Sequence, residues 1–307
     1  MTPPLLSIVT PCLNRAALIA QAIESAREQD YPHTEHIVTD GGSTDGTLAV
    51  LRRYPHLRVT SERDRGLYDA LNKAIRSARG EIIGQLNSDD LYEPAVFGAV
   101  MQAFADHPEA DAVVGGALAF EEGAAGPVVR HRYQPIATEG FLRRATLGAT
   151  TINAWFFRRR VYDRIGWFSP DYAIAADRDF LLRFCLAGCV FLPLDLPVYR
   201  YRYHGGSLTI NDQHSLGTVK ALDEHLLMAQ RLRDDTEDLL VRSAARLWHR
   251  ATALEKVIVL ARNGRLGRAG AAAARQAAED PAWLLYAPRA LCGKAISRVM
   301  RRRPSCP

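Results

Sequence analysis

The chain has 307 residues, of which 48% are hydrophobic and 24% charged, with a formal net charge of +5. These fractions are those of an ordinary globular protein, so they exclude a disordered chain, a collagen-like repeat and a small disulfide-stapled protein. Five cysteines without a Cys-x-x-Cys pair favour a reducing compartment such as the cytosol. No apolar run reaches the roughly 18 residues that a spanning helix needs, and the first residues do not predict a cleaved signal peptide.

The first 105 residues alternate predicted strands and helices. Short apolar runs predict strands, and apolar positions at helical spacing predict helices. The predicted strands are 5–11, 35–40, 57–61 and 81–86, and the predicted helices are 16–29, 44–54, 67–78 and 95–104. Ser43 or Thr44 is the expected N-cap of the second helix. Crossover helices of this length favour a parallel sheet with helices on both faces.

The pattern changes after residue 105. A hairpin, a strand, a helix and an extended segment are predicted at 112–133, 151–157, 180–187 and 190–203. From residue 215 the chain is predicted to be mostly helical. We therefore expect an α/β domain over 1–214, divided at residue 105, and a helical extension over 215–307.

Polar residues end the first four predicted strands: Asn14, Asp40, Asp64 and Asp89. The carboxyl ends of parallel strands meet at one edge of the sheet, where ligands bind. Crowded carboxylates repel one another unless a proton or a cation neutralises them, and oxygen ligands favour Mg²⁺ or Mn²⁺ shared with phosphate. The sequence has neither G-x-G-x-x-G after its first strand nor G-x-x-x-x-G-K-[ST], which disfavours a dinucleotide dehydrogenase and a P-loop ATPase.

Three segments carry a resemblance to family 2 glycosyltransferases. Residues 7–14 (SIVTPCLN) are similar to the family's opening, and residues 37–47 (IVTDGGSTDGT) to its V-x-D-G-S-x-D-x-T segment. Residues 87–90 (NSDD) stand where the family keeps its D-x-D-type motif. The order and spacing also match over residues 5–93, and a looser resemblance to bacterial exopolysaccharide and O-antigen transferases continues to about residue 210.

The resemblance implies a GT-A fold, a nucleotide-sugar donor, a divalent cation (Mn²⁺ or Mg²⁺) and inversion at the anomeric carbon. Residues 1–105 would then be the nucleotide-sugar-binding half, and residues 106–214 the acceptor half. The implied donor-binding residues are Pro11, Asn14, Asp40, Asp64, Asn87, Ser88 and Asp90. Among them, Asp40 would hydrogen-bond the nucleobase, and Asp64 would line the nucleoside site.

The implied metal ligand is Asp89, because Asn87 replaces the first Asp of the D-x-D-type motif. His204 begins a segment that resembles the family's His-x-x-Ser loop, so it would be a second metal ligand or a phosphate donor. The neighbouring Arg200 and Arg202 could meet diphosphate oxygens.

An acceptor hydroxyl is a poor nucleophile until a base takes its proton. The family commonly keeps this base in a Glu-Asp pair at the start of a helix. Here Asp177 takes the Asp position, while Ala176 replaces the Glu. Asp179 is the alternative base, and Asp177 could instead only cap the helix.

The implied function is metal-dependent transfer of a sugar to a saccharide or lipid-linked saccharide acceptor in cell-surface polysaccharide synthesis. A catalytically weak protein that binds nucleotide sugars or anionic polymers is the alternative. A sugar nucleotidyltransferase is disfavoured, since no Gly-rich loop with a lysine follows the first strand.

Positive charge is concentrated in residues 242–307, which hold 14 basic and three acidic residues, a net +11. Apolar residues lie among these charges: Trp283, Leu284, Leu285, Tyr286, Ile296, Val299 and Met300. This combination suits an anionic bilayer surface, and no motif indicates a nucleic-acid partner. We therefore expect a cytoplasmic protein attached peripherally to the inner face of the cytoplasmic membrane. A solvated helical face or an oligomer contact is the alternative use of this segment.

Overall fold

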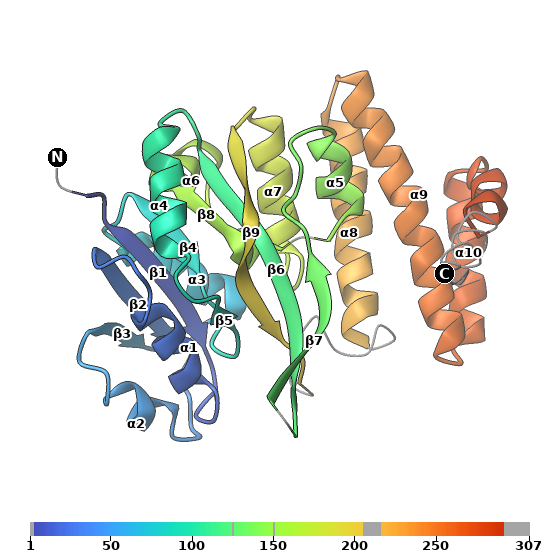
Figure 1. Ribbon diagram of the computed structural model, residues 1–307. Coiled ribbons are helices and arrows are strands. Elements are labelled where there is room, and N and C mark those ends of the chain that lie inside the picture. Colours follow the sequence, from blue (N-terminus) through green and yellow to red (C-terminus); the bar gives the residue numbers. More distant parts are fainter. Residues whose placement is uncertain (1–2, 125, 150, 205–215, 292–307) are drawn as a thin grey trace, which may run out of the picture. The chain divides into compact units, whose positions relative to one another are not determined.

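The structure is a computed structural model that describes residues 3–124, 126–149, 151–204 and 216–291. The chain divides into two compact units, Met1–Ser207 and Leu208–Pro307. The first unit is an α/β unit and the second is helical (Figure 1). The boundary predicted from the sequence, between residues 214 and 215, lies outside the described residues.

The first unit begins with four parallel strands in the order β3-β2-β1-β4. Their bounds are Leu6–Cys12 for β1, Thr34–Asp40 for β2, Leu57–Ser61 for β3 and Ile82–Gln85 for β4. Every residue of β1 and β4 is buried, as expected for central strands covered on both faces. The predicted strands of this half are confirmed to within a residue or two.

Three helices connect these strands: α1 (Ile19–Arg27), α2 (Thr47–Leu51) and α3 (Leu67–Ser77). A fourth, α4 (Phe97–Asp106), follows the last of them. Helices α1 and α4 lie on one face of the sheet and α3 on the other (Figure 1). The prediction for α2 is wrong at its start. The helix begins after Gly46, whose φ of 94° favours glycine, and the Ser43 hydroxyl donates a hydrogen bond to Asp40.

The sheet continues as a mixed sheet of nine strands. Beyond β4 the order is β8-β6-β9-β5, and β7 pairs with β6. The added strands are β5 (Leu91–Tyr92), β6 (Ala112–Gly123), β7 (Gly126–Tyr133), β8 (Trp155–Arg158) and β9 (Phe191–Arg202). Strand β8 is antiparallel to β4 and β6, whereas β6 and β9 are parallel. The parallel arrangement predicted for the first 105 residues is thus confirmed for β1 to β4, and the strands added beyond β4 make the sheet mixed.

Three short helical segments and one longer helix complete this unit: α5 (Phe141–Leu147), η1 (Ile152–Ala154), α6 (Arg159–Ile165) and α7 (Ala176–Leu186). Aromatic side chains hold α7 in place, because Phe180 and Phe184 pack within 6 Å of the Phe157 ring. The first turn of α7, which carries Asp177, is fixed by this packing.

The second unit contains α8 (Leu216–Asp235), α9 (Leu239–Arg262), α10 (Leu266–Glu279) and a further helical segment, 283–291. Trp283 is buried against Ala253 and Leu254, and its indole N–H donates to the Arg250 carbonyl at 3.1 Å. Its expected place on a membrane-facing surface is therefore wrong. Ile296, Val299 and Met300 lie outside the described residues. Among the helices that the structure describes, none is both long and apolar enough to cross a bilayer.

His36 of β2 predicts a loss of stability in acid. Its imidazole is buried, Nε2 lies 2.9 Å from Thr10 Oγ1, and Nδ1 has no hydrogen-bond partner among the described residues. Burial, together with the charge of His56, lowers the pKa of His36 to about 3. The unfolded chain takes up a proton near pH 6.5 and the folded protein does not, so stability is complete above that pH and falls below it.

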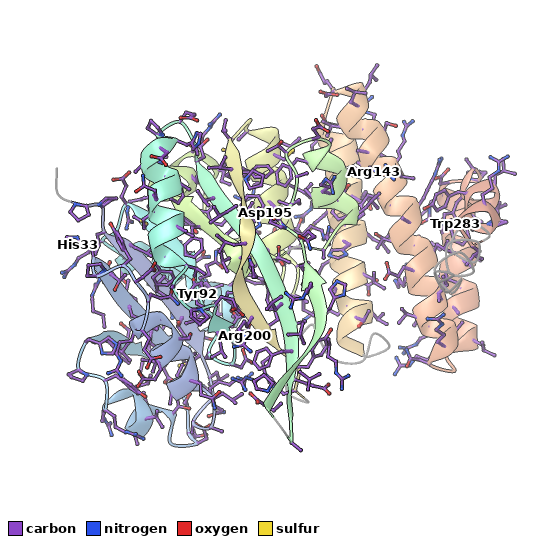
Figure 2. The ribbon with its side chains drawn as sticks, in the orientation of Figure 1. His33, Tyr92, Arg143, Asp195, Arg200 and Trp283 are labelled. Atoms are coloured by element: carbon purple, nitrogen blue, oxygen red, sulfur yellow. The ribbon has the colours of Figure 1, made fainter. Side chains whose placement is uncertain are left out.

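We expect the free energy of unfolding to fall by about 2 kcal/mol from this group between pH 7 and pH 5. Urea unfolding of the wild type and of His36→Gln at both pH values measures the difference. The variant should lose the His36 contribution, whereas the exposed His33→Gln (His33 is labelled in Figure 2) should behave as the wild type. An equal pH dependence in all three proteins would contradict the prediction.

Candidate active site

The loops that follow β1 and β2 are hydrogen-bonded to each other at the carboxyl edge of the sheet. The Asn14 N–H donates to Ser43 Oγ at 2.7 Å, and Asn14 Oδ1 accepts from the Thr44 N–H at 2.9 Å. The Arg15 N–H donates to Thr47 Oγ1 at 2.8 Å. Asn14 has a φ of 53°, a left-handed conformation that asparagine tolerates. Asn14 is thus placed at this edge, as predicted.

Asp40 lies at the end of β2 with its carboxylate buried. Its Oδ2 accepts from the N–H groups of Gly42 and Ser43 at 3.1 and 3.0 Å and from Ser61 Oγ at 2.7 Å. Burial acts to raise the pKa of Asp40, but the hydroxyl and N–H donors outweigh it and hold the pKa below its usual range. A nucleobase would therefore have to compete with the Ser43 hydroxyl for this carboxylate.

Asp64 lies directly against the loop after β2. A Cβ atom added to Gly41 would stand 2.4 Å from Asp64 Oδ2, and Asp64 Oδ1 accepts from the Gly66 N–H at 2.9 Å. Pro11 is buried in β1, next to Thr39 of β2. The structure thus brings Pro11, Asn14, Asp40 and Asp64 to one edge, as the strand-end pattern predicts.

Asp89 follows β4 and contacts the side chains of Arg15 and His204, which come from distant parts of the chain. Its Oδ2 lies 3.0 Å from His204 Nε2 and 3.4 Å from Arg15 Nε. The Asp89 side chain is 16% exposed, so this carboxylate remains open to solvent. The two residues predicted as metal ligands are therefore adjacent. The rest of the His-x-x-Ser loop lies outside the described residues.

Asp90 is buried beneath Asp89 in a hydrogen-bond network. Asp90 Oδ2 accepts from the Tyr199 hydroxyl and from Asn87 Nδ2, both at 3.0 Å, and Oδ1 accepts from the Arg202 N–H at 2.8 Å. Burial, and next the charge of Asp89, raise the pKa of Asp90 to about 7. Asp90 and Asn87 thus hold the loop through bonds to each other and to β9, and their predicted contacts with the donor stay a prediction. Ser88 is buried as well.

Arg202 is a second residue whose position differs from expectation. Its guanidinium is 3% exposed, donates to the Asp89 carbonyl at 2.9 Å and to Gln21 Oε1 at 2.6 Å, and pairs with Glu122. Arg200, labelled in Figure 2, pairs with Glu93 at 3.2 Å and lies over the Phe120 ring. Both arginines are engaged by the protein, and their expected contacts with diphosphate oxygens stay a prediction.

Sequence reasoning missed Arg15 and Tyr199 as parts of this site. Arg15 stands next to Asn14 of the opening motif, so its place after the first strand could have indicated a cationic side chain at this edge of the sheet. Nothing in the sequence marks Tyr199, because its hydroxyl reaches Asp90 only when β9 runs beside the loop after β4.

Asp177 lies in the first turn of α7, and Asp177 Oδ1 accepts from the Arg178 N–H at 2.7 Å. Asp179, the alternative, is instead paired with Arg183 at 2.7 and 2.9 Å. The pKa of Tyr201 is raised by burial first, then by the charge of Asp90 and, more weakly, of Asp177. The Asp177 carboxylate therefore acts electrostatically on Tyr201 of β9.

The donor set fits a cation that is shared with a substrate. Within the described ranges there is no cluster of three or more His, Cys, Asp or Glu side chains able to hold a metal. Asp89 and His204 offer one oxygen and one nitrogen. Mg²⁺ and Mn²⁺ at nucleotide sites commonly take few protein ligands and complete their shell with phosphate oxygens and water.

Residues 7–166 match the family described as Glycosyl transferase family 2. The chain belongs to this family. It is therefore a glycosyltransferase, and the resemblance of the opening, V-x-D-G-S-x-D-x-T and D-x-D-type segments is confirmed.

Named relatives and a solved structure extend this result. The chain is 29% identical over 270 residues to the PGL/p-HBAD biosynthesis glycosyltransferase of Mycobacterium bovis (strain BCG / Pasteur 1173P2), covering 84% of this chain and 98% of that protein. It is 27% identical over 154 residues to the putative teichuronic acid biosynthesis glycosyltransferase TuaG of Bacillus subtilis (strain 168), covering 48% and 61%.

The mannosyltransferase PcManGT of Pyrobaculum calidifontis, solved in complex with GDP-Man and Mn²⁺, is similar in fold, with a TM-score of 0.60 and 23% identity. The match covers 95% of this chain and 81% of that one. This chain therefore has a GT-A-like mixed α/β sheet followed by a helical region, as expected.

Proposed function

We propose that this enzyme transfers a sugar, with inversion, from a nucleotide-diphosphate donor to a saccharide or lipid-linked saccharide acceptor in cell-surface glycan synthesis. The observation that carries the proposal is the meeting of Asp89, His204 and Arg15 at the carboxyl edge of the sheet. The GDP-Man complex of PcManGT and the biosynthetic names of the two relatives support it.

At the donor end, Asp89 and His204 would hold Mn²⁺ or Mg²⁺, which supplies positive charge to the diphosphate leaving group. Arg15, whose side chain is 27% exposed, donates hydrogen bonds to phosphate oxygens from the same side. Asn14 and Asp64 border the nucleoside, on the loops after β1 and β3.

At the acceptor end, Asp177 takes the proton of the attacking hydroxyl. Its place in the first turn of α7 stabilises the carboxylate, since the N-terminal end of a helix favours negative charge. Asp179 is a weaker candidate, because its carboxylate is engaged by Arg183.

Nucleotide-sugar turnover tests the donor end. Purified protein is incubated with Mn²⁺ and a panel of UDP-, GDP- and dTDP-sugars, and release of nucleoside diphosphate is measured. We expect EDTA to abolish release, and Asp89→Asn to lower it by roughly 100-fold, because the cation loses its carboxylate ligand. Full activity in EDTA would overturn the metal assignment. Calorimetric binding of a donor without any turnover would favour the alternative, a nucleotide-sugar binding protein.

Paired substitutions in α7 test the acceptor end. Asp177→Asn should lower kcat by about 10²–10⁴-fold with donor affinity kept, because the shape stays while the proton acceptor is lost. Asp179→Asn is the matched control, because Asp179 lies two residues further along the same turn of α7. This variant should keep kcat while losing part of the Arg183 pairing. Steady-state kinetics and donor calorimetry measure both. Loss of donor affinity in Asp177→Asn would show that Asp177 has a structural part. Loss of kcat in Asp179→Asn alone would make Asp179 the base.

The helical unit supports peripheral attachment to an anionic bilayer. In segment 283–291, Trp283 faces the protein, while Leu284, Leu285 and Leu291 are 57%, 66% and 46% exposed. Arg289 is exposed on the same segment, which belongs to the region of net charge +11. Exposed leucines beside basic residues suit the boundary between headgroups and acyl chains, where each Lys or Arg contributes about 1 kcal/mol.

Sedimentation with vesicles tests this attachment. We expect the wild type to sediment with vesicles containing anionic phosphatidylglycerol, less so at high salt, and the double variant Leu284→Gln/Leu285→Gln to stay in the supernatant. Leu239→Gln/Leu240→Gln is the matched control, because these leucines are even more exposed but adjoin the acidic residues Asp234, Asp235, Glu237 and Asp238. Equal recovery of all three proteins in the supernatant would leave the segment a solvated face or an oligomer contact.

A further inference from the structure

The first turn of α7 is capped by a residue from another helix. A helix leaves its first four N–H groups without partners inside the helix. Ala175, the residue before α7, has no side-chain oxygen that could accept from them. The hydroxyl of Tyr68, on α3, accepts from the Asp177 N–H at 3.4 Å and donates to the Ile174 carbonyl at 2.9 Å. The backbone on both sides of the α7 start is therefore tied to α3.

A second residue of α3 holds the beginning of the segment that leads into α7. Asn72 Nδ2 donates to the Phe168 carbonyl at 2.8 Å, and Asn72 Oδ1 accepts from the Phe168 N–H at 3.1 Å. The rings of Tyr68 and Phe168 also pack, with centroids 5.4 Å apart. Both α3 side chains are buried. Residues 168–175 form neither helix nor strand, so these bonds to α3 fix their path.

Helix α3 also begins at the donor side of the site. Gly66, the residue before the helix, donates its N–H to Asp64 Oδ1 at 2.9 Å. In the first turn, Asp69 Oδ2 accepts from the Arg65 N–H at 3.1 Å. One helix of 11 residues therefore connects the loop proposed to border the nucleoside with the segment that carries Asp177.

We propose that Tyr68 is a positioning residue for the acceptor base. Its hydroxyl fixes the first turn of α7 and thereby the direction of the Asp177 carboxylate. This inference rests on the proposed function, in which Asp177 takes the proton of the attacking hydroxyl. A base must lie within hydrogen-bond reach of the proton that it removes, so a small shift of its backbone lowers the rate. Asn72 assists by holding the same segment at Phe168.

Removal of one hydroxyl group tests the positioning. Tyr68→Phe keeps the packed ring and loses the hydrogen bonds at the start of α7. Transfer is measured from the donor found active in the nucleotide-sugar panel to octyl glycosides of glucose, galactose and N-acetylglucosamine. We expect kcat to fall by about tenfold while donor affinity, measured by calorimetry, is kept. Tyr31→Phe is the matched control and should keep kcat, because the half-buried Tyr31 also donates to a backbone carbonyl, that of Pro4 before β1, at 2.6 Å.

A double-mutant cycle separates positioning from a general loss of stability. If Tyr68 acts through Asp177, Tyr68→Phe should cause no further loss of kcat once Asp177→Asn has removed the base. Losses that multiply in the double variant, or full kcat in Tyr68→Phe, would overturn the positioning role and leave the base assignment standing. Full kcat in Asp177→Asn would overturn the proposed base, and this inference with it.

Amide hydrogen exchange, measured by NMR, reports on the same contact without turnover. We expect the Asp177 amide to exchange about tenfold faster in Tyr68→Phe than in the wild type, because the N–H loses the Tyr68 acceptor at the end of a helix. Tyr31→Phe should leave this amide unchanged. Unchanged exchange in Tyr68→Phe would show that the hydroxyl does not hold the first turn of α7, and would overturn the proposal whichever donor or acceptor the enzyme uses.

Discussion

The buried guanidinium of Arg202 connects the parts of the chain that form the active site. It binds the carbonyl of Asp89, the side chain of Gln21 on α1 and Glu122 on β6, while the backbone N–H of Arg202 donates to Asp90 Oδ1. A charge buried to this extent is tolerated only when its hydrogen bonds are made, and removal of one partner of such a pair typically costs about 3–5 kcal/mol. The loop that carries Asp89 is therefore held in place only when α1 of the first half and strands β6 and β9 of the second half are folded around Arg202.

The carboxylates at the ends of β2 and β4, Asp40 and Asp89, differ in how their negative charge is stabilised. Asp40 is satisfied by N–H and hydroxyl donors of its own neighbourhood, so it orders the loops after β2 and β3. Asp89 is only partly satisfied by Arg15 and His204 and stays open to solvent. This difference supports a structural part for the first carboxylate and a ligand-binding part for the second, on the same edge of one sheet.

Much of the first half could be predicted from the sequence. Strands β1 to β4 and their helices follow from short apolar runs and helical periodicity, and the strand-end rule brought Asn14, Asp40, Asp64 and Asp89 together. The start of α2 was missed, because Gly46 begins the helix while Ser43 bonds to Asp40. The short elements β5, α5 and α6 were missed as well, since seven or fewer residues carry little periodicity and are held by tertiary packing.

The sequence by itself determined the family, the open α/β half and the residue types at the strand ends, because these depend on local patterns and on motifs. Only the tertiary structure decided which of these residues are buried among protein partners and which reach solvent. The motif positions of Asp90 and Asn87 suggest substrate contact. Both side chains are instead bonded within the protein, Asp90 to Asn87 and also to Tyr199 and Arg202 of β9. Strand β9 lies more than 100 residues further along the sequence, so a local pattern could not reveal these bonds. Trp283 is buried for the same reason, since a helix pattern gives the amphipathic faces but not the neighbour that covers them.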